Sequence, residues 1–192
     1  MLRILLPALI FSASVFADDT QQLKLVEAAK EQVGVTLFYD SRYQKIAYPG
    51  GDIPLQRGVC TDVVIRAYRK LGADLQLLVH RDMVKAWDAY PRSWNNKAPD
   101  SNIDHRRVPN LATFFKRNGK TLAIGKDSRT YQPGDIVTWR LTSGVPHIGV
   151  VSDQLSGSGV PLVIHNIGWG TVIEDRLFDF EITGHYRYSP QT

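Results

Sequence analysis

The hydrophobic pattern of this 192-residue chain changes character part-way along its length. In the first half, apolar residues recur at the spacing of amphipathic helices, as at Leu23, Val26, Ala29 and Val33. In the second half, β-branched and aromatic segments are separated by clusters of Gly, Ser and Pro, a pattern typical of antiparallel strands. Helices followed by strands predict an α+β domain and argue against an alternating α/β fold.

The same patterns predict boundaries for the individual elements. Helices are predicted at residues 19–34, 60–72, 74–91 and 110–119. An antiparallel meander is predicted from strands at residues 134–141, 147–153, 161–167 and 184–189. Two segments lack periodicity: we expect residues 35–58 to form a long loop with one short strand, and residues 92–109 to form a long surface loop.

The first 17 residues have the pattern of a secretory signal peptide. A single early Arg3 precedes an apolar run from Ile4 to Phe11, and small residues stand at Val15 and Ala17, on either side of Phe16, with the expected cleavage site after Ala17. The apolar run is too short to cross a bilayer, so an uncleaved anchor is the less favoured interpretation. We therefore expect an exported, periplasmic protein whose residues 18–192 form one domain, with no membrane span after cleavage.

Charge narrows the classes of partner. The chain has a formal net charge of +4, and removal of Arg3 with the leader lowers it by one. Its Lys and Arg residues are not concentrated in runs, so the sequence does not predict a nucleic-acid-binding protein. A mild basic excess suits an anionic polymer such as a cell wall. We expect a monomer that uses no cofactor.

Cys60 is the only cysteine, so no intramolecular disulfide can form in an oxidising compartment. It stands where a loop becomes a helix, with Gly58 before it and Asp62 in the first turn. Unpaired N–H groups at a helix start favour a thiolate, which predicts a reactive nucleophile. An inert buried thiol and an intermolecular disulfide are the alternatives. Asp62 is interpreted as a helix-start acid, with substrate binding as the alternative.

Two histidines are suited to act as base and orienting residue for this thiol. His147 opens a predicted strand after a turn, and His165 lies in the next predicted strand. Residues in register on antiparallel neighbours lie about 5 Å apart, so these rings can form a Cys–His–His relay with Cys60. Asn166 is the alternative orienting residue if strand alternation places it on the correct face.

The predicted loop at residues 92–109 contains Asp104, His105, Arg106 and Arg107. The guanidinium fork of arginine binds carboxylates in bidentate fashion, so these residues are candidates for a substrate-binding rim. A solvated charged loop is one alternative interpretation, and a catalytic relay through His105 is another. The sequence contains no HxH or HExxH spacing, so no metal site is predicted.

The order of these motifs resembles a known family. Cys60 at a helix start, followed by QPGDIVTW, HIGVVSD and VIH, is similar to the order in NlpC-type cell-wall cysteine peptidases, a rearranged branch of the papain-like fold. The resemblance implies a papain-like α+β fold in which N-terminal helices pack on a C-terminal antiparallel sheet. It also implies Cys60 as nucleophile, His147 as general base and His165 as orienting residue. Thr61 and Asp62 stand where that family has Ser-Gly.

The blocks GVCTDVVIRAYR and NIDHRRVPNL further resemble an exported bacterial family of unknown function, typified by YijF. From these resemblances we expect a thiol hydrolase that cleaves an amide bond in the stem peptide of peptidoglycan, with a muropeptide-like partner. Asn166 and Trp169 are further substrate-binding candidates, although large aromatic residues are more often part of a core. A non-catalytic cell-wall-binding protein and an acyltransferase that uses the Cys60–His147 pair are the alternative functions.

Overall fold

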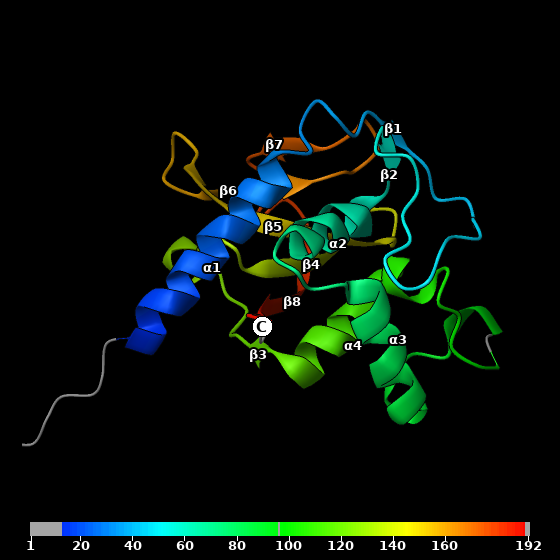
Figure 1. Ribbon diagram of the computed structural model, residues 1–192. Helices are drawn as coiled ribbons and strands as arrows, with labels where there is room; N and C mark the ends of the chain where they lie inside the picture. The colour runs from blue at the N-terminus through cyan, green and yellow to red at the C-terminus, as the bar shows by residue number, and fades with distance from the viewer. Residues whose placement is uncertain (1–12, 96, 191–192) are drawn as a thin grey trace, which may run out of the picture.

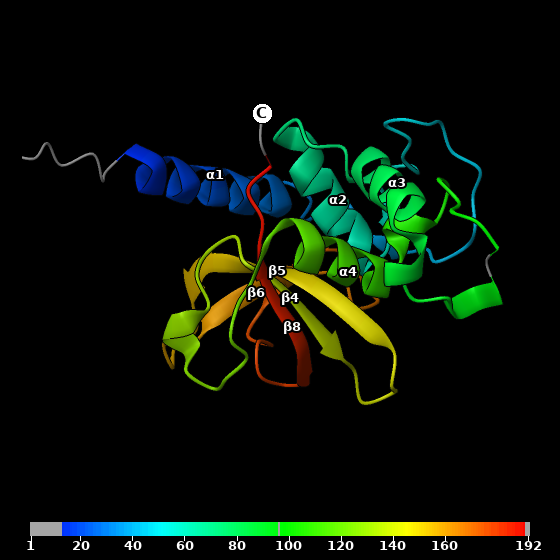
Figure 2. The ribbon, with the colours of Figure 1, turned by 90° about the horizontal axis from the view of Figure 1, so that it is seen from below.

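Helices cover one face of an antiparallel β-sheet in this protein (Figures 1 and 2). The computed structural model describes residues 13–95 and 97–190. The α-helices of these residues are α1 (Ala13–Lys30), α2 (Cys60–Lys70), α3 (Leu75–Lys85) and α4 (Val108–Asn118). Helix α1 packs against α2, and both contact strand β5 of the sheet. The predicted α+β class, with N-terminal helices packed on a C-terminal antiparallel sheet, is confirmed.

The sheet has the strand order β3-β8-β4-β5-β6-β7, and all of its pairings are antiparallel. Its strands are β3 (Lys120–Thr121), β4 (Ile136–Arg140), β5 (Pro146–Leu155), β6 (Pro161–His165), β7 (Val172–Glu174) and β8 (Glu181–Arg187). Strands β4 to β6 form a meander, as predicted, and β7, which the sequence patterns do not predict as a strand, extends it by pairing with β6. The simple meander is wrong at its last strand, because β8 crosses back to pair with β4 instead of following β6.

Strand alternation divides the core between the two faces of the sheet. The face toward the helices carries Ile136, Ile148, Val150 and Ile164. The opposite face carries Val137, Trp139, Val151 and Val163, which pack with Leu177 of the segment between β7 and β8. Because both faces are covered, the central strands bury consecutive residues, Ile136 to Trp139 in β4 and His147 to Ser152 in β5, instead of alternating between buried and exposed ones.

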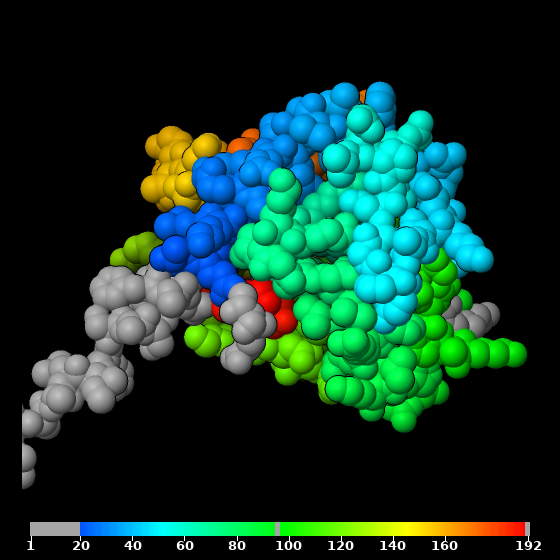
Figure 3. Space-filling view, viewed as in Figure 1, coloured from blue at the N-terminus to red at the C-terminus, as the bar shows by residue number. Residues whose placement is uncertain are grey.

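Two short strands precede α2. Strands β1 (Phe38–Tyr39) and β2 (Arg57–Gly58) pair in parallel. The segment between them forms the surface beside α2 and α3, as the cyan atoms of Figure 3 show. Residues 35–58 are therefore mainly the long loop that the sequence predicts, with two short strands rather than one.

Two predicted segments have different boundaries. The helix predicted at residues 74–91 ends at Lys85 and is followed by a separate 3₁₀ helix, η1 (Trp87–Ala89). Residues 92–109 are not a surface loop throughout. They contain the 3₁₀ helices η2 (Ser93–Asn95) and η3 (Asp104–Arg106), and α4 already begins at Val108. All three residues of η3 are buried, and the charged groups of two of them have partners inside the protein: Arg106 donates to Asp62, and Asp104 accepts from Arg107.

The predicted signal peptide falls mainly on residues 1–12, which lie outside the described residues. Residues 13–17 form the beginning of the backbone of α1. Within residues 13–95 and 97–190, no helix has both the length and the apolar character needed to cross a membrane.

Candidate active site

Cys60 is the first residue of α2. The backbone of the preceding Val59 is extended, and its N–H group donates to the Asp62 carboxylate at 2.7 Å. Asp62 therefore caps the start of the helix, which agrees with its interpretation as a helix-start acid. Cys60 is a free thiol that is only 4% exposed.

Burial dominates the electrostatics of the thiol. Burial raises the pKa of Cys60 to about 12, and the negative charge of Asp62 acts in the same direction. Backbone N–H groups, that of Ile148 foremost, favour the thiolate but do not offset the burial. The resting protein therefore holds a neutral thiol at pH 7, whereas the helix-start position alone predicts a lowered pKa.

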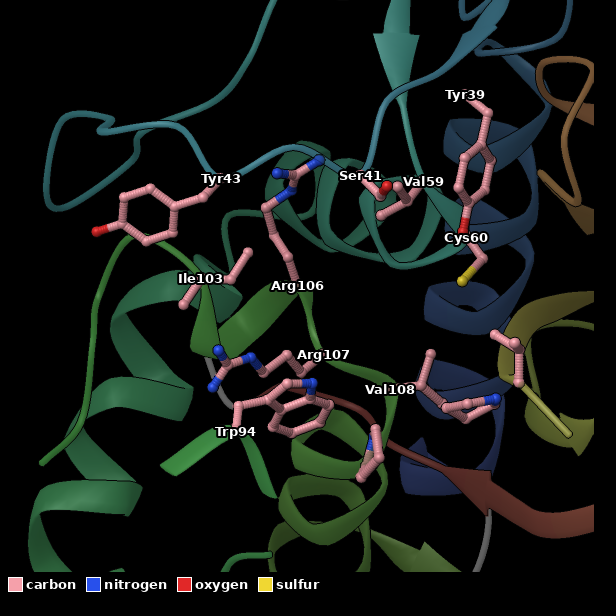
Figure 4. Close-up of a pocket in the computed structure, with 13 residues that line it drawn as sticks. Tyr39, Ser41, Tyr43, Val59, Cys60, Trp94, Ile103, Arg106, Arg107 and Val108 are labelled. Atoms are coloured by element: carbon pink, nitrogen blue, oxygen red, sulfur yellow. The ribbon is translucent and has the colours of Figure 1, made fainter. Parts of the chain in front are cut away.

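A pocket of about 470 Å³ opens on Cys60 (Figure 4). At one end, the side chain of Tyr39 extends toward the Cys60 sulfur (Figure 4). Tyr43, Trp94 and Arg107 line the other end. Burial, followed by the nearby Cys60, raises the pKa of Tyr39, so its hydroxyl group stays protonated and can donate a hydrogen bond.

The structure brings together the two predicted histidines. A hydrogen bond of 2.7 Å joins Nε2 of His147 to Nδ1 of His165. His147 lies near the start of β5, directly opposite Trp139 of β4, and His165 ends β6. The two rings meet edge to face with centroids 5.0 Å apart, and Trp139 packs against His147. The indole thus supports one side of the histidine pair.

Gly149 explains how the strands approach closely enough for this contact. A Cβ atom at this position would lie 2.9 Å from the Ile164 carbonyl oxygen and 3.1 Å from the His165 Cβ atom. Glycine is suited to positions where another part of the chain comes this near. The glycine of the HIG motif therefore makes room for His165.

Both rings favour the neutral form. Burial, with the neighbouring His165 as second cause, lowers the pKa of His147 to about 3. Burial also lowers the pKa of His165, although the Glu174 carboxylate opposes that shift. A neutral imidazole is the form that can accept a proton from a thiol.

The Cys60 sulfur contacts strand β5 at Ile148, the residue after His147, through the Ile148 backbone N–H group. The ring of His147 is bonded to His165, and among the described residues no hydrogen bond joins it to Cys60. In enzymes without substrate, catalytic hydrogen bonds are often long or poorly aligned and tighten on binding. Neither histidine lines the pocket, and strand alternation places both rings on the sheet face that carries Trp139 and Val163, whereas Cys60 packs with the helix-side face. The structure therefore brings the two predicted histidines together and places Cys60 beside the same strand, without a contact between thiol and base.

Asn166 makes no hydrogen bond to the His147 ring, although it is the alternative orienting residue. Its Nδ2 group donates to the Gly58 carbonyl oxygen at 3.2 Å, and its Oδ1 atom accepts from the Gly168 N–H group at 3.1 Å. The side chain is completely buried. Asn166 therefore fastens the end of β6 to the turn before Cys60, and the contact to the His147 ring comes from His165.

Of the four charged candidates in the segment before α4, two lie away from the pocket. Asp104 and His105 are buried and do not line it. Asp104 accepts a hydrogen bond from Arg107 at 3.2 Å, and burial lowers the pKa of His105 to about 3. Among the described residues, no group of three or more His, Cys, Asp or Glu side chains is arranged to hold a metal ion.

The two arginines line the pocket in different ways. The guanidinium group of Arg106 is turned inward to the Asp62 carboxylate, with two bonds of 2.9 Å. The guanidinium group of Arg107 lies over the ring of Trp94, 4.2 Å from its centroid. Arg107 therefore presents its guanidinium group beside Trp94 at the pocket, whereas that of Arg106 is bound to Asp62.

Trp169 lies outside the pocket. It is 91% exposed, between Gly168 and Gly170, and it does not belong to the core. The N–H group of Thr171 donates to the Thr36 carbonyl oxygen at 2.8 Å, which holds this turn beside the segment that leads to β1. Substrate contact by Trp169 requires a ligand that extends beyond the pocket.

Three residues near the site were not singled out in the sequence. Tyr39 and Tyr43 come from a turn-rich segment, and Glu174 comes from a short strand at the edge of the sheet. None belongs to a recognisable motif. Glu174 could have been found only as a polar residue on the strand that follows His165. That inference requires knowing that β6 and β7 pair.

These features define a class: an α+β protein with a buried thiol at a helix start and two hydrogen-bonded histidines on neighbouring antiparallel strands. Residues 26–188 match the domain of unknown function DUF1287, and the chain belongs to that family. It is 57% identical over 166 residues to the uncharacterized protein YijF of Escherichia coli (strain K12), covering 86% of this chain and 81% of that protein. The predicted membership of a YijF-like family is confirmed.

Among solved structures, the chain is similar to NlpC1 from Trichomonas vaginalis. The TM-score is 0.48 and the sequence identity is 13%. The similarity covers 90% of this chain and 45% of the other, so the chain spans about half the length of that structure.

Proposed function

We propose that this protein is an exported thiol hydrolase that cleaves an amide bond in the stem peptide of peptidoglycan. One observation carries the proposal: Cys60 starts a helix at a pocket and contacts Ile148, the residue after His147, whose ring is bonded to His165. A thiol nucleophile needs a base, and the base needs an orienting partner. The resemblance of the motif order to NlpC-type peptidases supports the substrate class, and the predicted leader supports a periplasmic location.

In the first half of the reaction, the Cys60 sulfur attacks the carbonyl carbon of the scissile amide while its proton passes to His147. Because thiol and imidazole are both neutral at rest, this proton transfer accompanies the attack. His147 then protonates the departing amine, and a thioester remains on Cys60. In the second half, water attacks the thioester and gives a proton to His147. The carboxylic acid leaves, and His147 returns the proton to the sulfur.

Negative charge develops on the carbonyl oxygen in both halves. The backbone N–H group of Cys60, at the start of α2, is one donor for this oxygen. The Tyr39 hydroxyl group, which is kept protonated beside the sulfur, is a second. Both donors are in place before substrate binds, which is what makes such stabilisation effective.

The far end of the pocket suits a peptide that carries a carboxylate. Trp94 and Tyr43 offer aromatic surface, and Arg107 offers positive charge between them (Figure 4). Arginine binds carboxylates well, and its stacking on Trp94 restricts its motion before binding. A stem peptide with its acyl group at Cys60 can direct a neighbouring carboxylate toward Arg107.

The proposal is tested with the protein from residue 18 onward and purified muropeptides. Mass spectrometry is expected to show two fragments whose masses sum to substrate plus water. Cys60→Ala is expected to abolish the reaction, while Ser158→Ala, in an exposed turn, is a matched control that retains it. Intact muropeptides after incubation with wild-type protein, or equal cleavage by Cys60→Ala, would contradict the proposal.

A second function has one observation in its favour. The raised pKa of Cys60 is also what an idle thiol in a non-catalytic cell-wall-binding protein would show. Such a protein would retain muropeptide affinity in Cys60→Ala and would release no fragment. Acyl transfer, which uses the same residues, is distinguished by products in which an added amine takes the place of water.

A further inference from the structure

The Nε2 atom of His165 is buried and has one charged group beside it. His165 is 1% exposed, and its other ring nitrogen is occupied by the bond to His147. Among the described residues, Nε2 has no well-aligned hydrogen-bond partner. The Oε2 atom of Glu174 lies 3.3 Å away, within ion-pair distance. Since buried polar atoms in native proteins nearly always have a partner, Glu174 is the residue placed to supply it.

The pairing of β6 with β7 holds Glu174 in this position. Val172 lies opposite His165, and Glu174 lies opposite Val163, so His165 and Glu174 are diagonal neighbours on one face of the sheet. The same oxygen of Glu174 accepts a bond from Arg176 at 3.2 Å. The carboxylate is thus restrained by its strand on one side and by a guanidinium group on the other.

A carboxylate at this distance determines which nitrogen of His165 carries the proton. An N–H group that faces the oxygen is attracted to it, whereas a ring lone pair is repelled. With its proton on Nε2, neutral His165 has its lone pair on Nδ1 and accepts the 2.7 Å bond. His147 must then donate from Nε2, and its own lone pair lies on Nδ1.

We infer that Glu174 is a positioning residue that sets the tautomers of both histidines and leaves Nδ1 of His147 as the basic nitrogen. With the opposite tautomers, the lone pair of His147 would be consumed in the bond to His165, and no acceptor would remain for the thiol proton. The inference rests on the proposed function for the use of that nitrogen. The direction of the two hydrogen bonds does not depend on it.

Nitrogen-15 NMR of the imidazole rings tests the inference in the substrate-free protein, because Nδ1–H and Nε2–H tautomers give different spectra. The wild-type protein is expected to show His147 and His165 as Nε2–H. In Glu174→Ala, His165 is expected to gain an Nδ1–H population. Asp179→Ala is the matched control: it removes another partner of Arg176 at 2.9 Å, leaves the Glu174–His165 contact in place and should keep the wild-type tautomers.

Two further variants separate tautomer control from packing. Glu174→Leu fills similar space without an acceptor and serves if the alanine variant fails to fold, whereas Glu174→Gln keeps an acceptor oxygen and should restore the Nε2–H form. An Nδ1–H form of His165 in the wild-type protein would overturn the inference. So would unchanged tautomers in the Ala and Leu variants.

Kinetics then distinguish this inference from the proposed function. If muropeptides are cleaved, Glu174→Ala is expected to lower kcat by up to about 100-fold with little change in KM, as misplacement of a catalytic group does. An unchanged kcat would overturn the positioning role. If wild-type protein shows the expected tautomers but cleaves nothing, the proposed function and the role of Nδ1 fail, and the direction of the hydrogen bonds stands.

Discussion

Asp62 and Arg106 form a bidentate ion pair inside the protein, with two nitrogen-to-oxygen distances of 2.9 Å. Their side chains are 4% and 3% exposed. Asp62 also caps the N–H group of Val59, and Arg106 donates to the Asp40 carbonyl oxygen at 3.0 Å. The pair therefore joins the helix start that carries Cys60, the pocket wall around Asp40 and the 3₁₀ helix η3.

Removal of one partner of this pair should be costly. Arg106→Leu is expected to lower the free energy of unfolding by about 3–5 kcal/mol, because it leaves a buried carboxylate without its counter-charge. Urea denaturation measures the loss. Arg129→Leu, which breaks an exposed pair with Asp127, is the matched control and should change stability by about 1 kcal/mol or less. Equal effects of the two variants would show that the buried pair contributes no more than a surface one.

The reactivity of Cys60 should report its burial. Because burial raises the pKa of the thiol, alkylation in the folded, substrate-free protein is expected to accelerate only well above about pH 8.5, the free-cysteine value. Rates of iodoacetamide labelling from pH 6 to 10 measure this, and the urea-unfolded chain is the control with an ordinary profile. A fast, pH-independent reaction near pH 6 would instead reveal a preformed thiolate–imidazolium pair.

Acid should destabilise the fold through its buried histidines. Burial lowers the pKa of His105 and of His147 to about 3, so below about pH 6.5 the unfolded chain takes up protons first. Their stabilising effect is present above that pH and is lost as the pH falls toward 3, by about 1.4 kcal/mol per pH unit for each histidine. Urea midpoints at several pH values measure this slope. His105→Gln should reduce it, and an unchanged slope would contradict the assignment.

Gly149 should tolerate no side chain. In Gly149→Ala, the added methyl group meets the Ile164 carbonyl oxygen and His165, which predicts a loss of about 1–3 kcal/mol from overpacking. It should also displace His165, so any cleavage activity should fall further than stability alone explains. Gly157→Ala is the matched control, because a Cβ atom there meets nothing within 4 Å. Thermal denaturation and activity assays measure both effects. Equal stability and activity of the two variants would contradict the prediction.

Local patterns were sufficient to predict part of the site. The apolar spacing after Cys60 predicts a helix that begins at the thiol, and the runs around His147 and His165 predict neighbouring strands, which the structure pairs. The pairing of Arg106 with Asp62 could not be predicted, because it joins residues 44 positions apart and makes a charged residue part of the interior. The neutral state of the thiol likewise depends on burial by distant segments.

The return of β8 is the other feature that local patterns miss. Neither of its neighbours, β3 and β4, precedes or follows it directly in the chain, and a register shift near Thr138 interrupts its pairing with β4. Alternation identifies a strand, but the partner of that strand is decided by long-range packing.

The position of β8 also has a consequence for how the protein is made. As the chain leaves a ribosome or a translocation pore, β4 keeps an open edge until residues 181–187 have emerged. The sheet that carries both histidines therefore cannot be completed before β8 has emerged. Loss of residues 181–192 would remove the whole of β8 and leave an apolar strand edge available for aggregation.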